Sequence, residues 1–420
     1  MRLITEKVNI GSGSLVIGGG SPIVVQTMCN THTDDVEGTL AQCRRMVAAG
    51  AEMIRITVPG LQDVPHIREI RERLRAEGIM VPIVADIHFS AQTAIEVARF
   101  VDKVRINPGN FHKDHQMARA KFLQLLEVCK AHGTAIRIGI NHGSLGEYIT
   151  NLYGNTPQAM AEAAMEWVRM CVQADFRKVV ISLKSSNTAS MVQGYRALVQ
   201  MMKAEGVVFP LHVGVTEAGG GDSGRIKSCV GIATLLEEGI GDTVRVSLTE
   251  DPVNELPVAR YLAARYSSAP MPQLPERELK MLDAACTWGP KLLRHEVDSI
   301  EEEMDPYLRD EIMQAARHRF YKPEYIACPG CGRTMYDLQK AYREVMEKTA
   351  CFKDIVIAIM GCIVNGPGEM ADADWGYVGE GGGKVSIYKK NVPVLRHVPE
   401  DEAPDRLVAL IREDLKAQGK

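Results

Sequence analysis

The stretch VPIVADIHFSAQTAIEVARFVDKVRIN, residues 81–107, places two short runs rich in Val and Ile on either side of a segment with helical spacing. Runs that are nearly continuous in apolar residues are typical of parallel strands covered on both faces. The alternation repeats along the chain and predicts strands at 22–28, 53–58, 81–87, 103–107, 135–140, 178–184, 211–217 and 242–248, with helices such as 40–49 and 159–174 between them. Eight such units in about 250 residues predict a (β/α)8 TIM barrel. The alternative, a doubly wound sheet, more often ends at five or six strands.

The pattern changes after the eighth predicted strand. Residues 268–322 are rich in charge and proline and predict a mainly helical connector. A smaller α/β unit follows, with a helix near 335–348, strands at 354–361 and 384–390, and a closing helix from about 404. We therefore expect a TIM barrel in 1–267, the connector in 268–322 and a second α/β domain in 323–420.

The composition excludes several classes of function. The chain has 420 residues, a net charge of −4 and 24% charged residues, so no basic surplus indicates a nucleic-acid partner. No apolar run is long enough to cross a membrane, and the N-terminal stretch MRLITEKVNIGSG lacks the apolar core of a signal peptide. We expect a soluble, cytoplasmic protein whose ten cysteines are reduced thiols or metal ligands rather than disulfides.

Four predicted strands carry an arginine between apolar neighbours: Arg55 in IRIT, Arg105 in VRIN, Arg137 in IRIG and Arg245 in VRVS. Each lies near the C-terminal end of its strand, where TIM barrels place their active sites. One interpretation is four separate arginine–carboxylate pairs beneath the helices. The other is a surplus of positive charge that binds an anion, because guanidinium groups match phosphate oxygens; four of them would suit a diphosphate.

Further polar residues lie at the same predicted strand ends, and a glycine-rich loop, residues 219–224, precedes a helix as barrel phosphate loops do. These candidate binding residues are Asp86, His88, Asn107, Asn141, Lys184, Thr216, Glu217 and Ser247. Asp86 and His88 could also form half of a metal site, although no second Asp/His pair occurs on another strand.

The second domain contains a cysteine constellation. CPGC supplies Cys328 and Cys331, and GCIVNGPGE supplies Cys362. Cys-x-x-Cys spacing alone fits zinc, an iron–sulfur cluster or a redox dithiol. Cys351 competes as a fourth thiolate, but its setting at a helix end favours a half-buried structural thiol.

The turn that follows Cys362 ends in Glu369. Gly366 and Gly368 permit unusual backbone angles and Pro367 stiffens the bend, so the turn could bring Glu369 back toward Cys362. An ordinary surface turn is the alternative. In the first case, three thiolates and one carboxylate would hold a cluster with one ligand that a substrate oxygen can displace.

These motifs together resemble the 4-hydroxy-3-methylbut-2-en-1-yl diphosphate synthases of the non-mevalonate isoprenoid pathway. The resemblance rests on VVQTM, IRIT, VADIHF, VRINPGN, IRIGINHGSLG, VGVTEAGGGDSGRIKS, GDTVRVSLTEDP, ACPGCGRT and MGCIVNGPGEMADADWGYVG, which cover nearly the whole chain except the connector. It implies a TIM barrel followed by a domain with a [4Fe-4S] cluster held by Cys328, Cys331, Cys362 and Glu369.

The resemblance also implies the reaction, a two-electron reductive ring opening of 2-C-methyl-D-erythritol 2,4-cyclodiphosphate with loss of water. Its substrate-binding positions fall on Arg55, Asp86, Arg105, Asn107, Arg137, Asn141, Lys184, Thr216, Arg245 and Ser247. Its catalytic positions fall on Glu217, as the expected proton donor, with Lys184 and His88 as alternatives, and on Glu369. The electron donor would be ferredoxin or flavodoxin.

The connector departs from the family pattern. It is longer than in the compact bacterial enzymes and too short for the extra domain of the large plastid-type enzymes. We therefore expect a homodimer in which the cluster domain of one chain covers the barrel of the other. The competing classes of function are a phosphate-binding barrel with a zinc-stabilised tail and a cluster-bearing electron carrier.

Overall fold

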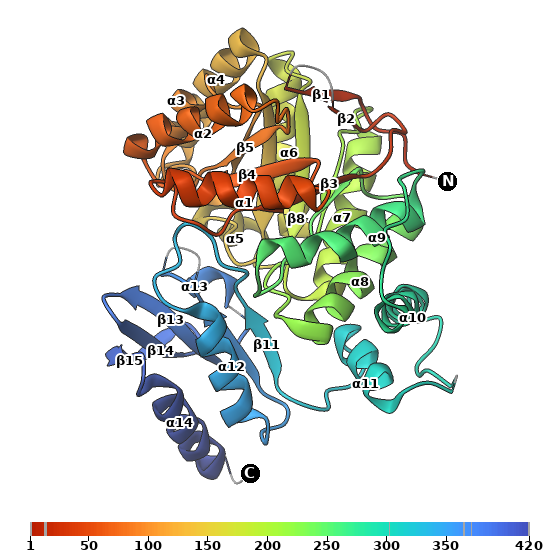
Figure 1. The fold of residues 1–420 in the computed structure, drawn as a ribbon, viewed down its shortest axis with the longest axis vertical. Helices are drawn as coiled ribbons and strands as arrows, with labels where there is room; N and C mark the ends of the chain where they lie inside the picture. The colour runs from red at the N-terminus through yellow and green to blue at the C-terminus, as the bar shows by residue number, and fades with distance from the viewer. Residues whose placement is uncertain (1, 12–14, 302, 364–365, 371, 419–420) are drawn as a thin grey trace.

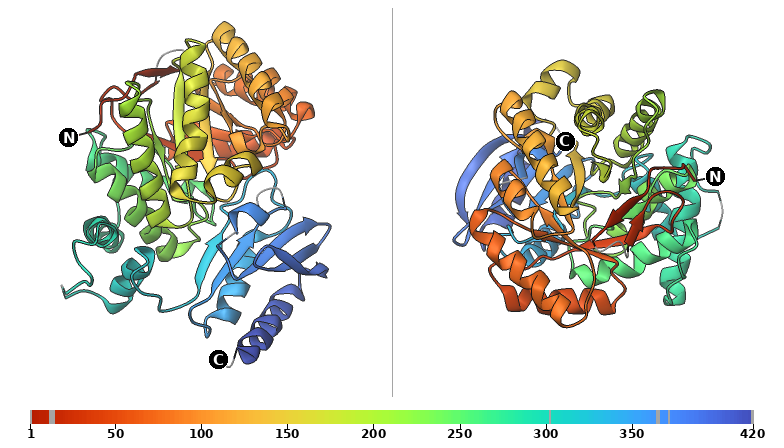
Figure 2. Two further views of the ribbon diagram at one scale, coloured as in Figure 1. Left: turned by 180° about the vertical axis from the view of Figure 1, so that it is seen from behind. Right: turned by 90° about the horizontal axis from the view of Figure 1, so that it is seen from above.

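An eight-stranded parallel sheet forms the first part of the chain, as the sequence predicts (Figures 1 and 2). The computed structural model describes residues 2–11, 15–301, 303–363, 366–370 and 372–418, without the side chains of Pro367 and Glu369. The sheet order is β8-β7-β6-β5-β4-β3-β10-β9, and a parallel bridge between Ile181 and Leu211 joins its two ends into a closed TIM barrel. The strands are β3 (Val24–Met28), β4 (Met53–Thr57), β5 (Ile83–Asp86), β6 (Lys103–Ile106), β7 (Ala135–Asn141), β8 (Val179–Lys184), β9 (His212–Val213) and β10 (Thr243–Val244).

Helices cover the outside of the barrel. They are α1 (Val36–Ala48), α2 (Val64–Ala76), α3 (Ala91–Val97), α4 (His115–His132), α5 (Glu147–Tyr153), α6 (Pro157–Gln173), α7 (Thr188–Ala204), α8 (Gly221–Glu237) and α9 (Glu255–Tyr266), with 3-10 turns at Leu61–Asp63, Pro108–Asn110 and Pro252–Asn254. Side chains such as Asp35, Asp114 and Asn187 cap helix N-termini by accepting a backbone N–H. All eight predicted strands are present, and seven of them are shorter than predicted. Five of these end early because the chain leaves the hydrogen-bonded ladder before it reaches the polar rim, and β3 and β8 only begin later than predicted.

A hairpin that the sequence pattern did not predict closes the N-terminal end of the barrel. It consists of β1 (Val8–Ile10) and β2 (Leu15–Ile17), paired antiparallel. Its apolar side chains pack against the first inward-facing residues of the barrel strands, among them Val24, Met53 and Val180. The barrel is therefore sealed with an apolar layer at this end, and its polar side chains lie above that layer.

The connector and the C-terminal domain follow the barrel. Residues 268–322 contain α10 (Glu276–Leu293) and α11 (Pro306–Ala315), which pack against the barrel. The C-terminal sheet has the order β11-β12-β13-β14-β15, with the first three strands parallel and the last two antiparallel. Its elements are β11 (Glu324–Ala327), α12 (Leu338–Thr349), β12 (Val356–Met360), α13 (Gly366–Glu369), β13 (Trp375–Gly381), β14 (Lys384–Lys389), β15 (Val392–Pro399) and α14 (Ala403–Ala417).

The C-terminal domain lies on the mouth of the barrel of its own chain (Figures 1 and 2). A parallel bridge joins Ala218 to Ala327, and Oγ1 of Thr249 donates to the carbonyl oxygen of Cys328 at 3.0 Å. The expectation that a partner chain would cover the barrel was therefore wrong for this structure. The connector packs beside the barrel, and a chain of this length still brings β11 to the rim without an additional spacer domain. None of the helices in the described part of the chain has the length and apolar character needed to cross a bilayer.

Candidate functional site

The mouth of the barrel gathers most of the predicted site residues around one cavity. Alternation along each strand directs every second side chain inward, so residues such as Arg105 of β6 and Arg137 of β7, which are register partners, face the same interior. The cavity is lined by Met28, Arg55, Asp86, His88, Arg105, Arg137, Asn141, Lys184, Thr216, Glu217, Arg245, Ser247, Cys328, Pro329, Gly330, Cys331 and Arg333. Eleven residues predicted from the barrel sequence and two of the predicted cysteines thus meet at one place.

Asn107 takes a different position. Its side chain is fully buried, accepts from the N–H of Gly109 at 3.0 Å and donates to Oγ of Ser144 at 2.8 Å. It does not line the cavity, and it holds two rim loops together instead. Its predicted role in direct substrate binding stays a prediction.

Two of the four strand arginines have carboxylate partners. Arg105 contacts Oδ1 of Asp86 at 3.2 Å and donates to the carbonyl of Gly139 at 3.0 Å. Arg245 makes a two-pronged pair with Glu255, with N–O distances of 3.0 and 3.2 Å, and both side chains are almost completely buried. The interpretation of separate arginine–carboxylate pairs therefore holds for these two.

The other two arginines lack such partners within the described chain. Nε and Nη2 of Arg55 lie 2.9 and 2.7 Å from Sδ of Met28, which is a weak acceptor. Nε and Nη1 of Arg137 have no hydrogen-bond partner among the described residues, although the side chain is only 1% exposed. Buried guanidinium donors without acceptors are energetically costly, and an anion at the mouth would satisfy them.

The positive charge at the mouth changes the ionisation of its neighbours. Burial opposes the ionisation of Asp86, but the charges of Arg55 and Arg105 outweigh it and hold the pKa of this carboxyl well below its ordinary value. Burial, followed by the charges of Arg245 and Arg55, lowers the pKa of Lys184 well below its ordinary range. The mouth therefore keeps its carboxylate ionised and disfavours further cations.

His88 is neutral at physiological pH. Burial and the charge of Arg105 lower its pKa to about 3. Its Nε2 contacts Nη1 of Arg105, and its Nδ1 lies 2.9 Å from the side-chain amide of Asn110. With the amide turned over, Nδ1–H donates to Oδ1 of Asn110 while Nε2 accepts from Arg105. Both ring nitrogens are then engaged, so His88 suits orientation of Arg105 better than proton donation.

Glu217 lies where the barrel meets the C-terminal domain. Its backbone has φ +47°, a left-handed conformation that is uncommon for a residue other than glycine. Its carbonyl oxygen accepts from the N–H of Ala327 at 3.2 Å, and its side chain is 6% exposed. Its charge also affects the ionisation of both Lys184 and Cys328, so its carboxylate lies between the barrel cations and the thiols.

Three thiols converge above the barrel mouth. Burial and the neighbouring thiols of Cys331 and Cys362 raise the pKa of Cys328. Cys328 follows β11 and Cys362 follows β12, which are adjacent parallel strands. No group of three His, Cys, Asp or Glu side chains in the described chain is arranged to hold one metal ion. Converging thiols fit an iron–sulfur cluster, because a four-iron cluster is larger than a single ion and spreads its thiolate ligands farther apart. The side chain of Glu369 lies outside the described part.

Cys351 corrects a prediction. The sequence favoured a half-buried structural thiol, but Cys351 is exposed directly after α12. It lies beyond the last turn of the helix, where no described element covers it.

Comparison with known proteins agrees with this geometry. The family profile described as "GcpE TIM-barrel domain" matches residues 5–260, and the profile described as "GcpE protein C-terminal domain" matches residues 324–413. This chain belongs to the GcpE family. A relative from Phocaeicola vulgatus, named 4-hydroxy-3-methylbut-2-en-1-yl diphosphate synthase (flavodoxin), is 33% identical over 601 residues and covers 98% of each chain. A relative from Synechococcus sp. strain CC9311, named 4-hydroxy-3-methylbut-2-en-1-yl diphosphate synthase (ferredoxin), is 41% identical over 431 residues and covers 98% of this chain and 95% of the relative. The resemblance seen in the sequence motifs is confirmed.

The GcpE site in this chain also contains residues that the sequence reasoning did not single out. Arg333 donates to the carbonyl oxygen of Asp86 at 3.2 Å and so fastens the C-terminal domain to the barrel. The sequence signal that could have identified Arg333 is its position directly after the cysteine motif CPGCG. Glu255, the partner of Arg245, begins α9 and is 1% exposed. Acidic residues are common in the first turn of a helix, so no sequence signal distinguished Glu255.

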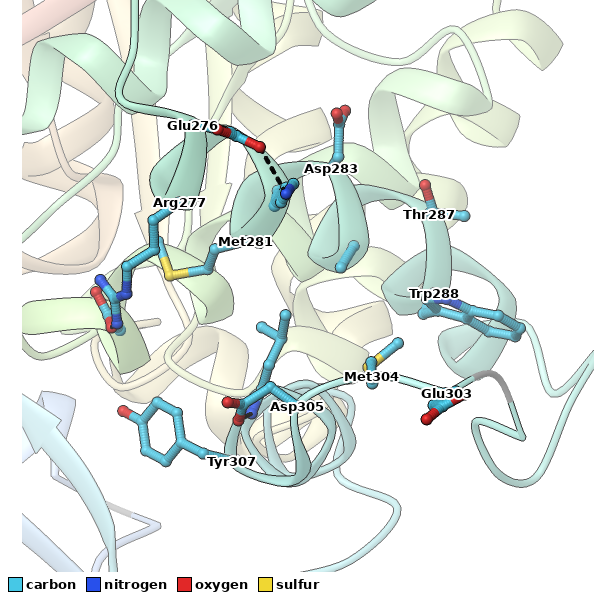
Figure 3. Close-up of a pocket in the computed structure, with 14 residues that line it drawn as sticks. Glu276, Arg277, Met281, Asp283, Thr287, Trp288, Glu303, Met304, Asp305 and Tyr307 are labelled. Atoms are coloured by element: carbon cyan, nitrogen blue, oxygen red, sulfur yellow. Dashed lines mark hydrogen bonds and ion pairs between the residues drawn. The ribbon is translucent and has the colours of Figure 1, made fainter.

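A larger cavity of this GcpE chain lies away from the mouth. It encloses about 820 Å³ between α10 and α11, and Figure 3 shows Met281, Trp288 and Tyr307 around it. Acidic and basic residues are mixed in its lining, and none of the predicted site residues reaches it. The cavity at the mouth encloses only about 60 Å³, enough for a few water molecules.

Proposed function

We propose that this protein converts 2-C-methyl-D-erythritol 2,4-cyclodiphosphate into 4-hydroxy-3-methylbut-2-enyl diphosphate. Family membership and the names of its relatives support this reaction. The change takes up two electrons and two protons: one ring C–O bond and one C–OH bond break, a C=C bond forms, and one water leaves. The observation that carries the proposal is the pair Arg55 and Arg137, two buried cations without carboxylate partners at hydrogen-bond distance in the described chain, beneath three converging thiols.

The arginines of the mouth bind the diphosphate. Arg137 offers two donors that have no partner among the described residues, and Arg55 offers donors that contact only the weak acceptor Sδ of Met28 among those residues. A bound phosphate oxygen supplies stronger acceptors for both. Arg105 is already oriented by Asp86 and His88, and Arg245 by Glu255. The same groups stabilise the charge that develops on the diphosphate when the ring C–O bond breaks. Asn141, Thr216 and Ser247 line the cavity and are proposed to bind the hydroxyl groups of the substrate.

Glu217 is the proposed proton donor to the departing hydroxyl group. Its position between the barrel cations and the thiols places it beside any substrate that fills the cavity. Lys184 is the alternative, because its lowered pKa makes its ammonium group a stronger acid than that of an ordinary lysine. His88 is a weaker candidate, since it is neutral and both ring nitrogens contact neighbouring side chains.

The proposed cofactor is a [4Fe-4S] cluster held by Cys328, Cys331, Cys362 and Glu369. When bound, it supplies single electrons and a Lewis-acidic iron. Ferredoxin and flavodoxin are both proposed as electron donors, because the names of the relatives include one or the other. Admission of the substrate requires the C-terminal domain to move away from the mouth, since about 60 Å³ is far smaller than an ordinary ligand pocket. The cytoplasmic location and the homodimer stay predictions, and closure within one chain removes the reason for which the dimer was expected.

Anaerobic purification tests the cofactor. The protein should be brown, with iron and sulfide in a ratio near that of a four-iron cluster, and it should turn over the cyclodiphosphate with a reductant. Cys331→Ser should lose the visible absorbance and the activity. Cys351→Ser is the matched control, because Cys351 is exposed and remote from the mouth, and it should keep both. A colourless protein with stoichiometric zinc would instead support the competing class, a phosphate-binding barrel with a zinc-stabilised tail.

A further inference from the structure

A lysine lies in the barrel one layer below the residues of the mouth. Lys103 precedes Arg105 by two residues on β6, so both side chains face the interior. Its register partners are Val84 on β5 and Ala135 on β7, which belong to the apolar layer above the N-terminal hairpin. Lys103 is completely buried. TIM barrels usually fill such a layer with branched apolar residues, so a lysine here needs an explanation.

The surroundings of Lys103 contain donors but few acceptors. Its Nζ lies 3.5 Å from Oε1 of Gln26 on β3, the one hydrogen bond recorded for it among the described residues. Nε2 of Gln26 and Nε2 of His212 on β9 have no partner in the described chain. Nε and Nη1 of Arg137, one layer higher on β7, are in the same situation. An ammonium ion would add one more unmatched cation to this layer.

The acidic residues near Lys103 are engaged elsewhere. Asp86 of β5 lies two register pairs higher, opposite Arg105, with which it forms an ion pair. Asp102, the chain neighbour of Lys103, binds Arg71 at the outer surface of the barrel. The hairpin below contributes apolar side chains. No carboxylate of the described chain therefore compensates a charge on Lys103.

Electrostatics agrees with this geometry. Burial, then the charges of Arg137 on β7 and Arg55 on β4, lower the pKa of Lys103 well below its ordinary range. Burial, then the charges of Arg137 and Lys184, lower the pKa of His212. A dianion at the mouth acts in the opposite direction, because it offsets the charges of Arg55 and Arg137 and so raises the pKa of a lysine beneath them.

We propose that Lys103 couples anion binding to proton uptake: it is an uncharged amine while Arg55 and Arg137 bind no anion, and it becomes an ammonium ion when a diphosphate binds above it. The new N–H bond forms at Nζ with a proton from solvent, and no electrons are exchanged. Lys103 then acts as a positioning residue that places a further positive charge beneath the diphosphate. This inference rests on the proposed function, because it takes the mouth to be a diphosphate site.

The test measures protons taken up when inorganic pyrophosphate binds to the anaerobically prepared full-length protein. Titration calorimetry at about pH 8.5, in two buffers with different ionisation enthalpies, gives the number of protons per pyrophosphate. The wild type should take up roughly one proton more than Lys103→Met. Lys203→Met, which removes an exposed lysine on α7, should match the wild type. Protonation of pyrophosphate itself cancels in these differences.

The sign of the pH dependence follows from the same linkage. A group whose pKa is higher in the complex than in the free protein takes up a proton on binding, so affinity rises as pH falls through that interval. The wild type should show this rise, and Lys103→Met should show a flatter profile. Lys103→Arg keeps a charge at every pH, so a folded Lys103→Arg protein should also lose the proton uptake.

Equal proton uptake in the wild type and in either folded Lys103 variant would overturn the inference. A wild type that binds pyrophosphate without taking up a proton beyond the protonation change of pyrophosphate itself would overturn it as well, even if neither variant folds. A wild type that does not bind pyrophosphate would overturn the diphosphate site itself, and the inference with it. Failure of the inference alone is thus distinguishable from failure of the proposed function.

Discussion

Replacement of Arg137 and Arg245 by methionine should have opposite effects on stability, although both are buried arginines of the barrel interior. Arg245 is paired with Glu255 at 3.0 and 3.2 Å. Two donors of Arg137 have no partner in the described chain, and Arg55 and Arg105 add positive charge around it. Arg245 therefore stabilises the folded protein through its partner, whereas Arg137 is retained at a cost.

The magnitudes follow from these contacts. Arg245→Met leaves the Glu255 carboxylate buried without its cation, and breaking a buried pair in this way costs about 3–5 kcal/mol. Arg137→Met removes a buried cation with two unsatisfied donors, each of which costs roughly 1–3 kcal/mol, while most of the aliphatic stem is kept. We expect the free energy of unfolding to rise by about 1–3 kcal/mol in Arg137→Met. Affinity for pyrophosphate should nevertheless fall at least about 100-fold, because charged hydrogen bonds to the anion are lost.

Urea unfolding without ligand and pyrophosphate titration by calorimetry measure the two quantities on the same samples. The unfolding curves should be compared by midpoint at equal slope, so that the change reports stability rather than compactness. If Arg137→Met were destabilised as strongly as Arg245→Met, Arg137 would have a stabilising partner within the folded protein. Its guanidinium donors would then not be available to bind an anion. Unchanged pyrophosphate affinity in a stabilised Arg137→Met protein would also refute the reasoning.

Two further experiments address catalysis and closure. Glu217→Gln preserves the shape of the side chain but removes its acidic proton, so turnover should fall by about two to four orders of magnitude. The visible absorbance and the binding of pyrophosphate should persist. Near-normal turnover would exclude Glu217 as the proton donor. Mixing a Cys328→Ala chain with an Arg55→Ala chain should restore no activity, because the thiols close over the barrel of their own chain and every chain in the mixture carries a defect. Recovery of a substantial part of wild-type turnover would show that closure occurs between chains.

The barrel was predictable because its signal is local and repeated. Each strand is a short apolar run, and the period of two places Arg105 and Arg137 on the inner face as soon as the barrel is recognised. The meeting of the eleven predicted barrel residues around one cavity follows from the closure of the strands into a barrel, whereas Cys328 and Cys331 reach the cavity only because the C-terminal domain lies on the mouth. The N-terminal hairpin escaped prediction because its strands have three residues each, too few for a pattern to emerge.

The partners of individual charges were not predictable, because they depend on packing between distant segments. Nothing in the sequence indicates that Glu255 pairs with Arg245 and that no carboxylate reaches Arg137 in the described chain. The same reason explains the error about closure. Lys227 of α8 lies 3.0 Å from Glu324 of β11, a contact between residues almost one hundred positions apart, and connector length alone does not reveal such a contact.

Charge balance connects the barrel, the anion and the closing domain. The barrel interior buries six cations, and among the described residues it sets only three carboxylates, those of Asp86, Glu217 and Glu255, against them. The cations are Arg55, Lys103, Arg105, Arg137, Lys184 and Arg245. A protein interior tolerates such a surplus of positive charge only when an anionic ligand compensates it or when the lysines are deprotonated. An anionic substrate supplies the missing charge, and thiolates above it add more. Binding of the diphosphate should therefore favour closure of the C-terminal domain, because the thiolates and Glu217 then approach a mouth whose cations are already ordered by the phosphate oxygens.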